Sequence, residues 1–182
     1  MRHIINAIIL LSLAVILQIV IFRFAIFSGG WAIIFFHLYG LTMLPVGWNK
    51  TSYLFIGAFT GIVLDIFMLT GGLHMAAGTF LGLALPHISS LVAPREGFHK
   101  GHIIIGFKDG WARYIIYSFL ITFLYSFSIF FIESGQLGFA LESFGKAIMS
   151  SGLTLVLLIL THGLIGIASK AKHSKVSAYP WS

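Results

Sequence analysis

Asp65 and His74 are the two side chains whose chemistry is least expected in their surroundings. Asp65 lies inside an apolar run over 52–69, and His74 lies at the start of the next apolar run over 73–92, after a glycine-rich turn. An ionisable group within hydrocarbon is costly by several kcal/mol, and for that reason it marks a functional site by default. An acid and an imidazole placed in this way can form a paired polar site that holds a helical hairpin together and helps to dock a partner.

Small residues accompany both groups at intervals of four residues. The spaced set is Gly57, Gly61 and Asp65 before the turn, and His74, Gly78 and Gly82 after it. Positions four apart lie on one face of a helix, so an antiparallel hairpin would bring the two sets together along a seam. Glycines at this spacing let helix backbones touch in lipid. The simpler interpretation is that Asp65 caps or solvates the end of its helix and that His74 only begins the next one.

Other reactive groups are few. The chain contains no cysteine, which excludes disulfides, iron–sulfur clusters and thiol chemistry. Of the five acidic residues only Asp65 lies in an apolar run, whereas acid–base catalysis and proton-coupled transport need several convergent groups. His99-x-x-His102 has the spacing of some metal ligands but lacks further ligands nearby, which indicates a solvated loop. We therefore expect no catalytic residue, no metal site and no cofactor.

The composition indicates which elements position these groups. Hydrophobic residues make up 58% of the chain and charged residues only 9%, with a mean hydropathy of +1.00. A soluble domain would need about a quarter of its residues charged, so this is an integral membrane protein. The net charge of +6 comes from basic residues between and after the apolar runs, where they orient helices. We expect no nucleic-acid partner.

The chain is predicted to form one all-α transmembrane domain over 1–182, a compact bundle of about six membrane-spanning helices. Nine of the eleven Lys and Arg residues then fall on one side, which places both termini in the cytoplasm. The run over 31–44 is short for a span, and Pro86 is expected to kink the helix that contains it. The expected spans are 4–22, 31–44, 52–69, 73–92, 114–132 and 145–168, with a polar cytoplasmic loop at 93–113 and a basic tail at 169–182.

Further polar residues lie inside the expected spans. Ser118, Thr122 and Ser126 form a stripe at helical spacing, which is expected to bond backbone carbonyls or a neighbouring helix. His162 is interpreted as a hydrogen-bonding residue between elements, and His37 as a packing residue.

The segment from Phe55 to Ala77 resembles the signature hairpin of MreD, the bacterial rod shape-determining membrane protein family. The resemblance lies in a glycine-containing helix that ends in Leu64-Asp65, a short glycine-rich turn, and then Gly72-Leu73-His74 followed by small residues. The Leu44-Pro45 step before the third run and the plan of about six spans without a large soluble domain are also similar to that family.

This resemblance implies a non-catalytic component of the machinery that elongates the cell wall, located in the bacterial cytoplasmic membrane as a multi-pass protein. Family members bind the scaffold MreC, and through it the MreB filaments and the glycosyltransferase–transpeptidase pair that synthesises peptidoglycan. The residues that match the family motif are Gly57, Gly61, Asp65, Gly72 and His74.

Two other classes of function are compatible with a small helical bundle. The first is the substrate-binding membrane subunit of an energy-coupling-factor vitamin transporter, which would need an outward pocket to which Trp31, Asp65, His74 and Glu133 contribute. The second is an intramembrane enzyme acting on lipid, and the lack of convergent ionisable residues argues against it.

Overall fold

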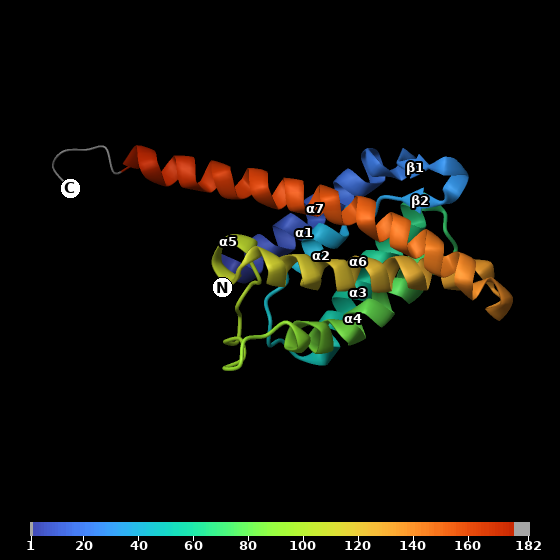
Figure 1. Cartoon of the computed structure of the whole chain (residues 1–182), viewed down its shortest axis with the longest axis horizontal. Helices are drawn as coiled ribbons and strands as arrows, with labels where there is room; N and C mark the ends of the chain where they lie inside the picture. Colours follow the sequence, from blue (N-terminus) through green and yellow to red (C-terminus); the bar gives the residue numbers. More distant parts are fainter. Residues whose placement is uncertain (1, 177–182) are drawn as a thin grey trace.

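The computed structural model describes residues 2–176, and the side chains of 5–165 except those of 28 and 137. It is mostly helical, with 75% of residues in helices. Figure 1 shows the helices packed side by side around a central α6. In chain order the elements are α1 (Arg2–Val20), η1 (Phe22–Phe24), β1 (Ile26–Phe27), η2 (Ser28–Gly30), β2 (Ala32–Ile33), α2 (Leu38–Thr42), α3 (Lys50–Met68), α4 (Leu73–Leu91), α5 (Gly106–Asp109), α6 (Trp111–Ser134), η3 (Leu137–Phe139) and α7 (Ala140–Val176).

Three helices are long and apolar enough to cross a membrane: Lys50–Met68, Trp111–Ser134 and the Ala140–Ile165 part of α7. This confirms a mostly helical membrane protein. The expected spans at 4–22 and 73–92 also correspond to helices, α1 and α4, although the apolar part of α1 over Ile5–Val20 is shorter. At about 1.5 Å per residue α7 is about 55 Å long, against about 30 Å of hydrocarbon. Figure 1 shows its C-terminal part standing clear of the other helices.

The bundle is built from two helical hairpins that meet at α6. α3 packs against α4, α4 packs against α6, and α6 packs against α7. The core between them is apolar, with Leu41 of α2, Leu81 of α4 and Ile121 of α6 among its buried members. α1 covers α2 and touches α3. α6 is therefore buried on more than one face, and its buried residues are spread along its whole length.

The predicted spanning helix at 31–44 is wrong. Ala32 and Ile33 pair in antiparallel fashion with Ile26 and Phe27 of β1, and the only helix in this stretch is the five-residue α2. All residues from 35 to 45 are nevertheless buried. Non-helical backbone is tolerated at membrane depth only where protein surrounds it, and this segment meets that condition.

Side chains of the flanking helices satisfy the backbone of this buried segment. Gln18 of α1 donates from Nε2 to the Ile34 carbonyl (3.1 Å) and accepts at Oε1 from the His37 N–H (3.3 Å). On the other side, the Ile33 N–H donates to Ser150 Oγ and the Phe35 N–H donates to Thr154 Oγ1, both residues of α7. These polar residues replace the ladder of hydrogen bonds that a spanning helix would have made.

Replacing Gln18 by Leu should lower the free energy of unfolding by about 2 kcal/mol, because a carbonyl and an N–H would both lose their partner in the core. Thermal unfolding of the detergent-solubilised protein measures this loss. The control is Ser12→Leu, since Ser12 lies on the same helix but is exposed. Equal melting temperatures for the two variants would contradict the role assigned to Gln18.

The polar segment contains the short helix α5, and the first part of the expected tail continues α7. Within 93–113, His102 Nε2 lies 2.9 Å from Asp109 Oδ1, and Asp109 Oδ2 accepts from the Ile105 N–H, which closes the loop that contains α5. The predicted tail over 169–182 is helical through Val176 as part of α7, and residues 177–182 lie outside the described part of the chain.

Candidate functional site: the glycine seam and its acid cap

The backbones of α3 and α4 touch along the predicted glycine seam. A Cβ added at Gly57 would overlap the carbonyl of Gly78, and one added at Gly61 would overlap the carbonyl of His74 and the Cα of Met75. Further along the same contact, a Cβ on Gly82 of α4 would lie 2.5 Å from the carbonyl oxygen of Tyr53 of α3. In each case the obstructing atoms belong to backbone, which cannot move aside as a flexible side chain can.

The turn between the two helices depends on glycine for a different reason. Gly71 and Gly72 have φ angles of 63° and 97°, in the left-handed region that residues with a side chain rarely adopt. A Cβ on either would meet nothing within 4 Å, so space is not what requires glycine here. Gly72 therefore belongs to the motif through its conformation, and it lies outside the seam.

Asp65 caps the first turn of α4 from across this turn. Its Oδ1 accepts from the His74 N–H (3.0 Å) and its Oδ2 accepts from the Met75 N–H (2.8 Å), while the Thr70 hydroxyl donates to Oδ1. The residue at the N-cap position is Gly72, which has no side chain to do this. A carboxylate at a helix N-terminus is favoured both by these hydrogen bonds and by the helix dipole.

The pairing of Asp65 and His74 therefore differs from an acid–imidazole pair. The carboxylate bonds the backbone of His74, whereas the buried imidazole turns towards α6 and shares a hydrogen bond of 2.7 Å with the Tyr125 hydroxyl. His74 thus connects the hairpin to the central helix. Asp65 thus caps the following helix and not the end of its own, and His74 holds helices together through its side chain.

An aromatic cluster that sequence reasoning did not predict surrounds this bond. Tyr125 contacts Phe35 at 5.3 Å and His37 at 4.9 Å between ring centroids, both edge to face, and both rings also approach His74. Phe35 and His37 come from the buried segment that was expected to be a helix. Because that segment is irregular, helical spacing could not have indicated which of its residues face Tyr125.

His37 is fully buried, and among the described residues neither of its ring nitrogens has a hydrogen-bond partner. Its ring makes edge-to-face contacts with Phe35, His74 and Tyr125. The interpretation of His37 as a packing residue agrees with these contacts.

All three residues of the polar stripe on α6, Ser118, Thr122 and Ser126, are buried. Thr122 donates to the carbonyl of Ser118 at 2.9 Å, as expected for a hydroxyl inside a membrane helix. The hydroxyls of Ser118 and Ser126 have no partner among the described residues. His162 of α7 accepts from the Gly106 N–H of α5 (3.1 Å) and stacks on Tyr114 at 4.2 Å, so it joins two elements as predicted.

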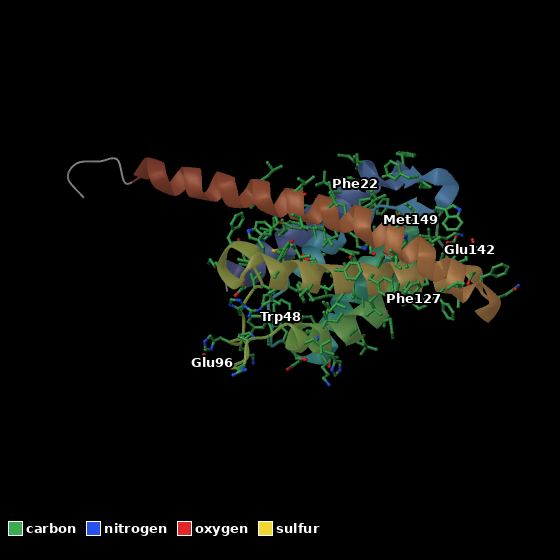
Figure 2. The ribbon with its side chains drawn as sticks, in the orientation of Figure 1. Phe22, Trp48, Glu96, Phe127, Glu142 and Met149 are labelled. Atoms are coloured by element: carbon green, nitrogen blue, oxygen red, sulfur yellow. The ribbon has the colours of Figure 1, made fainter. Side chains whose placement is uncertain are left out.

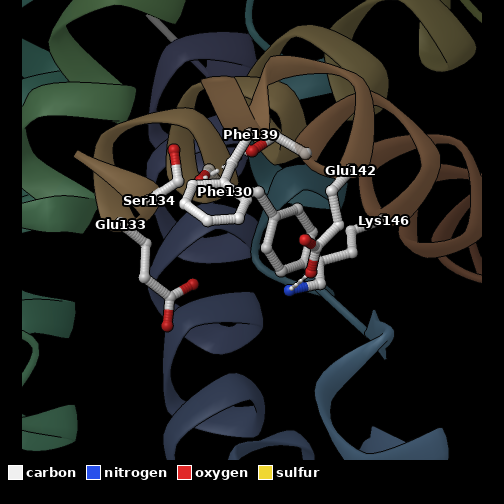
Figure 3. Close-up of a pocket in the computed structure, with 7 residues that line it drawn as sticks. Phe130, Glu133, Ser134, Phe139, Glu142 and Lys146 are labelled. Atoms are coloured by element: carbon white, nitrogen blue, oxygen red, sulfur yellow. Dashed lines mark hydrogen bonds and ion pairs between the residues drawn. The ribbon is translucent and has the colours of Figure 1, made fainter. Parts of the chain in front are cut away.

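Polar side chains gather at both ends of the bundle. Figure 2 shows Trp48 and Glu96 at one end and Glu142 at the opposite end. At the Glu142 end a cavity of about 300 Å³ separates Glu133 from an ion pair of 2.8 Å between Glu142 and Lys146, with Phe130 between the two (Figure 3). Of the four residues expected around an outward pocket, Glu133 lines this cavity, whereas Trp31, Asp65 and His74 do not.

Comparisons of the chain with protein-family models, with curated proteins and with solved structures find no match.

Proposed function

We propose that this chain is an MreD-like, non-catalytic component of the bacterial rod-shape machinery, which binds an MreC-like scaffold and helps to position peptidoglycan synthesis. One observation carries the proposal. The residues that match the family motif, Gly57, Gly61, Asp65, Gly72 and His74, act together as a single structural unit: a seam, a turn and a cap. Because each residue of the motif has a structural role in the same hairpin, the match to the family motif is more specific than the sequence pattern by itself.

The same unit suggests how a partner is bound. Both oxygens of Asp65 accept from donors of the hairpin itself, so in this proposal the carboxylate serves to shape the hairpin. Large apolar side chains point away from the seam on α3, among them Phe55 and Phe59, which are well exposed. In our proposal the scaffold meets this outer face, and the rigid seam keeps the face in one shape.

The proposal places the protein in the bacterial cytoplasmic membrane with six crossings and both termini in the cytoplasm. Three apolar helices of spanning length support it. The buried stretch around 35–45 supports it further, because it connects α1 to α3 through the protein interior without a helix of spanning length. MreB-like filaments and the wall-synthesising glycosyltransferase–transpeptidase pair would then be reached indirectly, through the scaffold.

A vitamin-binding subunit finds less support. It would need Trp31, Asp65, His74 and Glu133 around one outward pocket. Instead, the Trp31 ring lies under Lys146, and Asp65 caps α4. His74 bonds Tyr125, and Glu133 lines the cavity that Lys146 also lines. Asp65 and His74 are therefore bonded to other groups, and neither lines that cavity.

Affinity purification of the tagged chain from its source bacterium should recover an MreC-like, membrane-anchored scaffold, and depletion of the chain should make rod-shaped cells round or swell. Asp65→Asn should reduce recovery of the scaffold in proportion to the loss of folded protein, since the carboxylate acts through the fold. Rods of normal width after clean deletion would refute the proposal, as would submicromolar binding of a vitamin by the purified chain.

A further inference from the structure

Two neighbouring cavities at the end of the bundle opposite Glu142 share Trp48 as a common wall. The first, of about 320 Å³, is lined by Trp48, Asn49, Ser52 and Lys100. The second, of about 260 Å³, is also lined by Trp48. Its apolar lining includes Val46, Pro86, Ala93 and Phe98. The first cavity, with one charged and two polar side chains, is called here the polar cavity, and the second, whose lining is mainly apolar, the apolar cavity; Trp48 lines both.

The loops that form these cavities are held in place by backbone bonds. The Val46 N–H donates to the His102 carbonyl, and the Gly101 N–H donates to the Val46 carbonyl, both at 2.7 Å. At Gly47 the two loops approach so closely that a Cβ would lie 3.2 Å from the Cα of Lys100. The backbone that carries Lys100 is thereby fixed next to the polar cavity.

Tyr53 of α3 holds the backbone of Trp48 in position. The Tyr53 hydroxyl donates to the Pro45 carbonyl (2.6 Å) and accepts from the backbone N–H of Trp48 (3.4 Å). The ring centroids of Trp48 and Tyr53 lie 6.2 Å apart. Because the spanning helix α3 begins at Lys50, Trp48 lies where such a helix leaves the hydrocarbon. That depth, at the level of the lipid headgroups, is where tryptophan is most frequent in membrane proteins.

The polar cavity offers donors to an anion. Lys100 supplies an ammonium group, and Asn49, Ser52 and the Trp48 indole supply neutral N–H and O–H donors. No carboxylate of the described residues lines either cavity, so none provides a counter-charge there for the ammonium of a choline or ethanolamine headgroup. This donor set fits the phosphate of a headgroup that carries net negative charge.

We propose that the two cavities together bind one anionic phospholipid, with the phosphate at Lys100 and the glycerol and upper acyl chain against the lining of the apolar cavity. A free phosphate ion would occupy only the polar cavity, whereas a phospholipid would occupy both. This site is remote from the glycine seam, and it stands independently of the function proposed above.

Native mass spectrometry of the delipidated protein, titrated with phosphatidylglycerol or with phosphatidylcholine of the same acyl chains, tests the proposal. Phosphatidylglycerol should bind at least about fivefold more tightly, and Lys100→Gln should remove about that advantage without changing the binding of phosphatidylcholine. Lys108→Gln is the matched control, because Lys108 is an exposed lysine of the same polar segment that lines neither cavity.

Three results would overturn the proposal. They are equal affinities for the two lipids, equal losses in Lys100→Gln and Lys108→Gln, and complete displacement of phosphatidylglycerol by millimolar inorganic phosphate. The last would assign the polar cavity to a free anion. The Lys100 side chain is exposed, so its substitution should leave the melting temperature of the lipid-free protein unchanged, and Ser52→Ala provides a second, uncharged variant for the same titration.

Discussion

Gly61→Leu should destabilise the protein by about 3 kcal/mol or more, which is enough to remove most of the folded, monodisperse material from a detergent extract. The first carbon of any side chain at Gly61 would already overlap the His74 carbonyl and the Cα of Met75. α3 and α4 would have to separate to admit it. Fluorescence-detected size-exclusion chromatography of a tagged protein, followed by a melting curve, measures both the yield and the stability.

Ala58→Leu is the matched control for this experiment. Ala58 lies three residues earlier on the same helix, is only partly buried and already carries a Cβ. The control should therefore stay within about 1 kcal/mol of the parent chain. Gly61→Ala gives an intermediate test, because its single added carbon occupies the obstructed position itself. If Gly61→Leu and Ala58→Leu were tolerated equally, the close contact of the two helices would be refuted.

Asp65→Ala should cost about 2–3 kcal/mol, because two backbone N–H groups and the Thr70 hydroxyl lose their acceptor together. The loss should be local as well as global. Hydrogen–deuterium exchange should accelerate at the amides of His74 and Met75, the first turn of α4, before it does so elsewhere in that helix.

Two further variants separate the contributions to this cap. Asp65→Asn keeps one acceptor oxygen, and it should lie between the parent chain and Asp65→Ala. Thr70→Val removes a single donor and leaves both N–H groups capped, so it should have the smallest effect. Unchanged exchange at His74 and Met75 in Asp65→Ala would show that the carboxylate does not cap α4.

Local periodicity was sufficient to predict the hairpin. The four-residue spacing of Gly57, Gly61 and Asp65, repeated by His74, Gly78 and Gly82, follows from helix geometry and requires no knowledge of distant contacts. Low charge and high hydropathy likewise determined that the chain would be a helical membrane protein, because too few charged residues exist to face water.

Contacts between distant segments decided the rest. The stretch 31–44 reads as a helix because it is apolar, yet it is irregular because Gln18, Ser150 and Thr154, far from it in the chain, satisfy its backbone. The partner of the His74 imidazole was hidden for the same reason, since Tyr125 lies 51 residues away. Periodicity reports which face of an element is apolar, whereas the partner across that face depends on how the elements assemble.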